Sequence, residues 1–347
     1  MTIAQAFSTG IAKVNSSKRF ITFVWIVNVL VAGILAVPMM NQLENYIRDS
    51  GKEQSLLGSV DDNWFQSYQD DFQKSEIART LDYSIFGYAP FMHHLDGVLS
   101  GSVVKRIGGF LYDVVFRFHL DFSQFTLLTW LALLYALANT FFAGGFISAY
   151  AAEWPSTVSE FLVEGAKYFG RFFRLSLISF LLYYLFFVWF VDWANRGIPL
   201  WTQNEPSEMT PYVFYMGRNA IVLIVLALMM MSFDYAKIRL VLDGRYSALG
   251  ATGAGFRFAF GHFFRTFGLY LLLCLFGLGL ILVYSFLNSL VRQTGYWTIL
   301  LVFVIQQVYL FFRIWLKASF YATQTVFCQR AIHDQYTAAM KATQAAS

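Results

Sequence analysis

The chain has 347 residues, of which 57% are hydrophobic, 19% aromatic and only 13% charged, with a formal net charge of +4. A soluble domain carries about 25% charged residues, so this composition excludes an ordinary soluble enzyme, a disordered chain and a disulfide scaffold. The mean hydropathy of +0.52 favours an integral membrane protein.

Six stretches of the chain are long and apolar enough to cross a membrane, which takes about 20 residues for roughly 30 Å of hydrocarbon. They are residues 20–40, 125–150, 175–193, 219–242, 267–290 and 297–323. The first run is too long for a signal peptide and no A-x-A cleavage site follows it, so we expect it to remain as a span. The predicted fold class is therefore all-α integral membrane, with six transmembrane helices.

The placement of Lys and Arg predicts which side each loop faces. With the N-terminus inside, the inner segments hold 15 Lys and Arg residues, whereas the outer loops other than 42–123 hold 3. Positively charged loops tend to stay in the cytoplasm, and a loop as long as 42–123 does not count in this comparison. We therefore expect both termini on the cytoplasmic side of a bacterial inner membrane.

Two hexapeptides indicate an internal repeat. Residues 169–174 (FGRFFR) and 260–265 (FGHFFR) match at five of six positions, 91 residues apart, and each leads into a predicted span. Each also ends an amphipathic segment with Phe and basic residues, which is typical of a helix in the headgroup plane. Phe7 and Ala12-Lys13 match the first segment at an offset of 154 and suggest a weaker third copy. The alternative is that such segments match by composition alone.

The repeat predicts three parallel units, each an interfacial amphipathic helix followed by a transmembrane hairpin entering from the same side. The predicted organisation is 1–41 for the N-terminal interfacial helix and first span, 42–123 for an extracytoplasmic loop region, 124–150 for the second span, 151–242 for the second repeat, 243–325 for the third repeat and 326–347 for a cytoplasmic tail.

Three stretches carry a resemblance to known proteins: 232–239 (SFDYAKIR), 243–249 (DGRYSAL) and 260–270 (FGHFFRTFGLY). They resemble poorly characterised bacterial six-span membrane families, a layout that also occurs as the membrane domain attached to some glycerophosphodiester phosphodiesterases. The resemblance covers mainly residues 216–330 and implies a six-span membrane domain. The soluble phosphodiesterase domain has no counterpart here, so its activity is not carried over, and loop 42–123 departs from the pattern.

Four ionisable side chains lie inside predicted spans, where charge is costly. They are Asp234 and Lys237 in the fourth span and Arg313 and Lys317 in the sixth. At 1.5 Å per residue, Asp234 and Arg313 lie about 22 and 24 Å from the outer face, so Asp234 can pair with Arg313 or Lys317. One interpretation is a structural ion pair, or snorkelling to the inner headgroups. The other is a binding site for an anionic headgroup, because three cations outnumber one carboxylate.

The remaining polar residues indicate no catalytic or metal site. The outer loop holds residues of metal-ligating types whose spacing fits no standard motif, namely His93, His94, Asp96, His119 and Asp121. No catalytic or phosphate-binding motif is present, so we predict no cofactor and no enzymatic activity. The cations line the inner membrane boundary, which argues against nucleic-acid binding. Asn139 with Gly144-Gly145 is typical of a close helix contact.

Two functions are compatible with these features. The first is a non-enzymatic scaffold, assembly partner or lipid-interacting subunit, with anionic lipids at the cytoplasmic face and a membrane protein or a second copy as partners. The alternative is a transporter or channel for a small or lipid-like solute. A transporter predicts a cavity that reaches the bilayer midplane between helices, whereas a scaffold predicts side chains filling that space.

Overall fold

A computed structural model describes residues 1–50, 70, 97–117, 127–152, 157–207, 209–244, 247–291 and 296–346. All regular structure in these residues is helical. The helices are α1 (Ile3–Ser16), α2 (Lys18–Ser50), α7 (Ser102–Phe116), α8 (Leu127–Ala151), α9 (Val158–Phe186), the π-helix η2 (Phe187–Val191), α10 (Asp192–Thr202), α11 (Met209–Leu242), α12 (Ala248–Gly261), α13 (Phe263–Leu290) and α14 (Tyr296–Ala346).

Five helical segments are long and apolar enough to cross a membrane: α8, the continuous run of α9, η2 and α10, and then α11, α13 and α14. The pair α1 and α2, bent by 68° at its break, provides up to a sixth. These segments overlap the predicted spans, because each contains an apolar run of about the length that crosses a bilayer. The predicted all-α membrane class is confirmed at this level.

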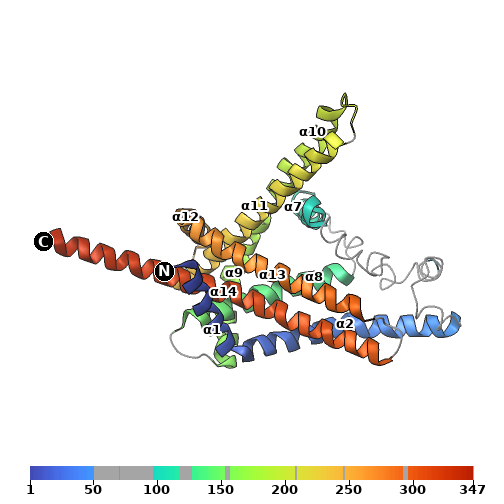
Figure 1. Ribbon diagram of the computed structural model, residues 1–347, viewed down its shortest axis with the longest axis horizontal. Coiled ribbons are helices and arrows are strands. Elements are labelled where there is room, and N and C mark those ends of the chain that lie inside the picture. Colours follow the sequence, from blue (N-terminus) through green and yellow to red (C-terminus); the bar gives the residue numbers. More distant parts are fainter. Residues whose placement is uncertain are drawn as a thin grey trace.

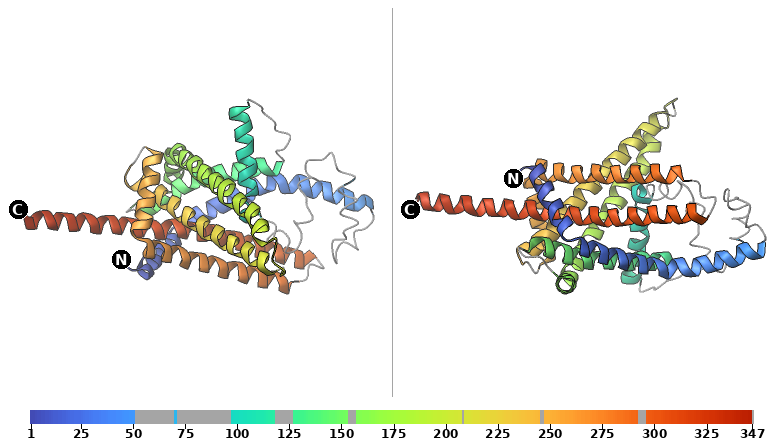
Figure 2. Two further views of the ribbon diagram at one scale, coloured as in Figure 1. Left: turned by 90° about the horizontal axis from the view of Figure 1, so that it is seen from above. Right: turned by 60° about the horizontal axis from the view of Figure 1, so that its bottom comes forward.

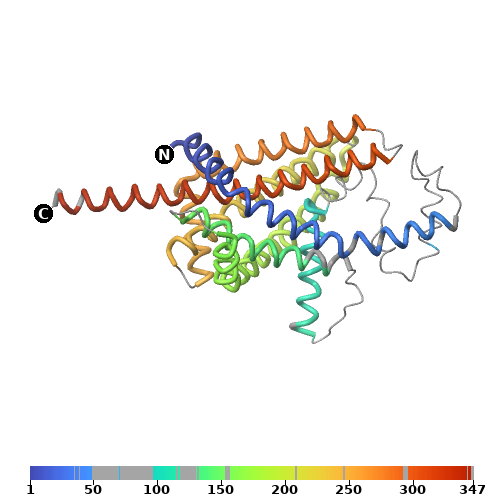
Figure 3. Tube along the Cα trace, turned by 90° about the horizontal axis from the view of Figure 1, so that it is seen from below, coloured from blue at the N-terminus to red at the C-terminus, as the bar shows by residue number. Residues whose placement is uncertain are grey.

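The long helices form a bundle with one divergent hairpin. Helices α2 and α13 lie beside α14, whereas the hairpin made by α9, η2, α10 and α11 diverges from them (Figure 1). The N-terminal helix α1 and helix α12 lie at the same end of the bundle, which we call the collar end (Figures 2 and 3). From this end α14 extends beyond the other helices as a single helix (Figure 2).

Helices α1 and α12 are short, capped and separated by a break from the long helices that follow. Each has 14 residues, and Thr2 and Ser247 accept hydrogen bonds from the first-turn amides. Their chains turn at Ser17 (φ −115°, ψ 30°) and at His262 (φ −121°, ψ 32°), two nearly identical conformations. The predicted interfacial helices at these positions are therefore distinct elements.

The second predicted interfacial helix is different, because it has no break before its span. Thr157 caps α9 with Glu160 in a capping box, and the helix then runs continuously to Phe186. The structure therefore has no break at the predicted junction between interfacial helix and span near residue 174. Phe172 and Leu175, on either side of this junction, are both fully buried.

Two helices continue past the ends of their predicted spans. Helix α2 continues to Ser50, into the predicted extracytoplasmic loop region 42–123. Helix α14 continues to Ala346, through most of the predicted cytoplasmic tail 326–347. Phe327 and Cys328 are buried against the bundle, and the Gln329 side chain donates a hydrogen bond to the Ala151 carbonyl at 2.8 Å. These contacts attach α14 to the bundle at residues 327–329, and the helix projects beyond the bundle after them (Figure 2).

Helix α1, helix α12 and the first turns of α9 are called the collar helices below. Glycines allow each of them to approach a long helix closely. A Cβ added at Gly255 of α12 would lie 2.5 Å from the Ala236 backbone of α11, and one at Gly10 of α1 would lie 2.5 Å from Thr323 of α14. A Cβ added at Gly145 of α8 would lie 2.7 Å from a backbone oxygen of α9. The close helix contact predicted from Gly144-Gly145 is therefore present.

The Gly255 contact makes a direct prediction. Gly255→Ala should lower the free energy of unfolding by about 1–3 kcal/mol, the usual cost of overpacking. Gly253 lies on the same helix with nothing within 4 Å of an added Cβ. Gly253→Ala should therefore stabilise the protein by up to about 1 kcal/mol, through helix propensity alone. Unfolding in detergent measures both variants, and equal effects would contradict the tight packing of α12 on α11.

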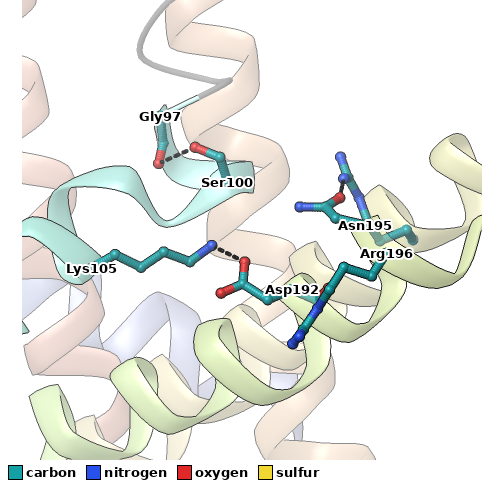
Figure 4. Close-up of polar contacts among 7 residues, drawn as sticks. Gly97, Ser100, Lys105, Asp192, Asn195 and Arg196 are labelled. Carbon is teal, nitrogen blue, oxygen red and sulfur yellow. Dashed lines mark hydrogen bonds and ion pairs between the residues drawn. The ribbon is translucent and has the colours of Figure 1, made fainter.

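Helix α7 belongs to the outer-loop region 42–123, and it packs against the divergent hairpin far from the collar end (Figure 1). The Cα of Gly108 lies against the ring of Tyr184 so closely that no Cβ would fit. The Lys105 ammonium contacts the Asp192 carboxylate at the start of α10 (Figure 4). This ion pair joins α7 to the start of α10.

Candidate functional site

A cavity of about 500 Å³ lies between the long helices. Its lining residues come from α2, α8, α9, α11, α13 and α14. Asn28 of α2 lies ten residues after the start of that helix, a distance of about 15 Å along the helix axis. The cavity therefore extends about 15 Å along the bundle from the start of α2.

The structure brings all four predicted charged residues into this cavity. Asp234 and Lys237 lie one turn apart on α11, and Arg313 and Lys317 lie one turn apart on α14. Because residues three and four apart share a helix face, each pair points toward the same region. The two helices pack against each other, so the four charged groups face one space.

The predicted pairing of Asp234 with a residue of α14 is wrong in its partner. The carboxylate pairs with the Lys237 ammonium of its own helix, with 3.1 Å between the two atoms. The side chains are 18% and 22% exposed, so this pair is largely shielded. Lys237 also lies 5.9 Å from the centroid of the Tyr321 ring. A partner one turn away on the same helix is reached without crossing the cavity, and this proximity decides the pairing.

Lys317 has a neutral partner. Its ammonium donates a hydrogen bond to the Asn139 side-chain oxygen of α8 at 2.6 Å, and the Asn139 amide donates to the Tyr135 carbonyl at 2.9 Å. The hydrogen bond positions the Lys317 ammonium without neutralising its charge. In the sequence, Asn139 beside Gly144-Gly145 indicates only a helix contact, although an amide inside an apolar span also signals a polar partner.

Arg313 has neither a hydrogen-bond partner nor an ion-pair partner among the described residues. It lines the cavity and is exposed. Of the four charged lining residues, Asp234 and Lys237 neutralise each other, which leaves Arg313 and Lys317 as two uncompensated cations. An uncompensated cation in a membrane span is costly, so this arrangement favours an anion in the cavity.

The rest of the lining is mainly aromatic. Phenylalanines come from α8, α11 and α14, and four tyrosines line the same cavity as the charged groups: Phe142, Phe146, Phe233, Phe320, Tyr135, Tyr183, Tyr270 and Tyr321. The sequence offers no signal for these tyrosines, because 20 tyrosines and 38 phenylalanines are spread along the chain. Aromatic faces suit the apolar part of a ligand, and tyrosine hydroxyls suit its polar part.

The outer-loop residues of metal-ligating types all lie outside the residues that the structure describes. They are His93, His94, Asp96, His119 and Asp121. Within the described residues, no group of three or more His, Cys, Asp or Glu side chains is placed to hold a metal ion.

No protein-family model, curated protein or solved structure matches the chain. The resemblance of residues 216–330 to bacterial six-span families therefore stays a prediction.

Proposed function

We propose that this multi-pass membrane protein binds an anionic, lipid-like molecule in its central cavity, with no chemical step. The observation that carries the proposal is the net positive charge of the cavity. Arg313 and Lys317 remain uncompensated because Asp234 is paired with Lys237. Anionic lipids are abundant in membranes, and clustered cations near a membrane boundary attract them.

The cavity favours ligand binding over a purely structural role. A scaffold predicts side chains filling the space between the helices, whereas about 500 Å³ is open there. Pockets for small molecules commonly have volumes of roughly 300–1,000 Å³ and mostly apolar walls with a few polar groups. A carrier for the same solute is the second candidate, supported by the divergence of the α9–α11 hairpin from α13 and α14 (Figure 1).

The proposal includes the predicted orientation. We place the collar end at the cytoplasmic face of a bacterial inner membrane, because the inner segments carry most of the Lys and Arg. In this orientation Arg313 and Lys317 face the leaflet that is richer in anionic lipids.

We also propose that three parallel units surround the cavity. The collar helices support this arrangement, since their caps Thr2, Thr157 and Ser247 are spaced by 155 and 90 residues. The fourth and eighth residues after each cap are buried in all three helices: Ala6 and Gly10, Phe161 and Gly165, and Ala251 and Gly255. The offsets differ by one residue from those of the hexapeptide and N-terminal matches.

The returning helices α8, α11 and α14 repeat at offsets of 91 and 87 residues. Phe142, Phe233 and Phe320 occupy equivalent positions on them, and all three line the cavity. Three residues later, Gly145, Ala236 and Thr323 each contact the collar helix of the following unit. These collar helices are α9, α12 and, for the last unit, α1. Asn139, Met230 and Lys317 are equivalent as well, so only the third unit carries a cation at this lining position.

Lipid retention tests the proposed function. After purification in mild detergent from bacterial membranes, the Arg313→Gln/Lys317→Gln variant should retain about tenfold less anionic lipid per protein molecule than the unaltered chain, the loss expected for charge-assisted hydrogen bonds. The matched control is Arg330→Gln/Lys341→Gln, which removes two exposed cations from the same helix. Mass spectrometry of bound lipid measures both, and equal retention by the two variants would contradict a headgroup site in the cavity.

A further inference from the structure

We propose that the ligand of this cavity is an amphiphile whose polar end is a phosphate monoester. This inference rests on the proposed function and names the chemical class of the ligand. Three features of the cavity carry it: the number of uncompensated charges, their spacing on one helix, and the aromatic surface beside them.

The first feature is the number of charges. The charged lining residues are Asp234, Lys237, Arg313 and Lys317, which together carry two net positive charges. The Lys237 ammonium is already paired with Asp234 at 3.1 Å. A ligand that neutralises the remaining two cations must therefore carry two negative charges. A monoanionic diester or carboxylate leaves one cation uncompensated, and a zwitterionic headgroup leaves both.

The second feature is the spacing of the two cations. Arg313 and Lys317 are four residues apart on α14, so their Cβ atoms lie about 5–6 Å apart on one face of the helix. Like charges at this spacing destabilise a helix, and a single anion between them removes that repulsion. The guanidinium offers two parallel donors that match phosphate oxygens, and the ammonium adds a point charge. The hydrogen bond from Lys317 to Asn139 uses one of the three N–H donors of the ammonium and leaves the others for this contact.

A phosphate monoester fits these requirements. It has three terminal oxygens and carries a charge of about −1.5 to −2 at pH 7, because its second pKa is about 6. A phosphodiester has two terminal oxygens and a single charge at every pH above its first pKa. The difference between the two classes is therefore both a charge and a hydrogen-bond acceptor.

The third feature identifies the remainder of the ligand as apolar. Phe142, Phe233 and Phe320 come from three different helices and line the same cavity as the cations. A free inorganic phosphate would leave these rings without a partner. Hydrocarbon next to the phosphate would bury against them, and burial contributes roughly 25 cal/mol per Å² of apolar surface.

The experiment compares ligands that differ only at the phosphate. Full-length protein in detergent is titrated with dihexanoyl phosphatidic acid, a monoester, with dihexanoyl phosphatidylmethanol, a diester with the same chains, and with inorganic phosphate, while thermal unfolding is followed. At pH 8 the monoester should bind about tenfold more tightly than the diester, the value of one added charge-assisted hydrogen bond. Its affinity should fall between pH 8 and pH 5 as the second proton binds, whereas the affinity of the diester should stay constant.

The variants assign the effect to the cavity. Arg313→Gln or Lys317→Gln should remove the preference for the monoester, and Arg330→Gln should leave it unchanged. Equal affinity for monoester and diester would overturn the monoester inference and leave the proposed anionic site standing. Inorganic phosphate as effective as the monoester would overturn the amphiphilic part. Failure of all three probes to bind would overturn both this inference and the proposed function.

Discussion

Replacing Asp234 by Asn should lower the free energy of unfolding in detergent by about 1–3 kcal/mol. Breaking a fully buried ion pair on one side costs about 3–5 kcal/mol, and the effect is smaller where water or headgroups reach the charges. The Asp234 side chain is 18% exposed, so the expected loss lies below the fully buried value. The loss arises because the substitution leaves Lys237 as a third uncompensated cation beside Arg313 and Lys317.

Two further variants make this result specific. Asp334→Asn removes the carboxylate that lies 3.3 Å from the Arg330 guanidinium on an exposed part of α14, with side chains 51% and 60% exposed. Its effect should stay within about 0.5 kcal/mol, as for most surface pairs. Lys237→Met added to Asp234→Asn removes the orphaned cation and should recover part of the loss. If Asp234→Asn were as silent as Asp334→Asn, the shielded ion pair would be refuted.

Asn139→Asp should reduce bound anionic lipid about tenfold while maintaining or raising protein stability. The substitution preserves the shape of the side chain and places a carboxylate beside the Lys317 ammonium, which now lies 2.6 Å from the Asn139 oxygen. The new ion pair competes directly with the ligand for Lys317. Binding and folding should therefore move in different directions, a combination that general destabilisation does not produce.

The comparison variant is Asn139→Leu, which removes the partner of Lys317 without adding charge. It should retain bound lipid and lose about 1–3 kcal/mol of stability, the cost of an unsatisfied buried polar group. Lipid content by mass spectrometry and unfolding in detergent are measured on the same preparations. A loss of lipid in Asn139→Leu as large as in Asn139→Asp would show that Asn139 acts through structure and not through charge.

The sequence predicted the spans well because hydrophobic length is a property of each helix by itself. The apolar run of α13 predicts residues 267–290, and the helix spans Phe263–Leu290. The boundary between the second interfacial helix and its span failed for the opposite reason. Whether α9 bends near residue 174 depends on what buries Phe172 and Leu175, and those partners are distant in the chain.

In the candidate site, too, some features could be predicted from the sequence and others depend on contacts between distant helices. A charge inside an apolar run is visible in the sequence, so Asp234, Lys237, Arg313 and Lys317 could be selected, and depth alone indicated that they could meet. Depth does not decide between partners, however. Asp234 has a closer cation on its own helix, and Lys317 finds Asn139 on α8. The cavity itself depends on how six helices pack and has no local sequence signal.

Photo-crosslinking in vesicles tests the central claim most directly. The unaltered protein is reconstituted with a trace of phosphatidic acid that carries a photoreactive group near the phosphate, and crosslinked peptides are mapped by mass spectrometry. We predict crosslinks in residues 310–321 of α14 and 230–237 of α11, the segments that line the cavity, and their loss in Arg313→Gln/Lys317→Gln. Crosslinks confined to the outer faces of the helices, unchanged in that variant, would contradict binding in the cavity.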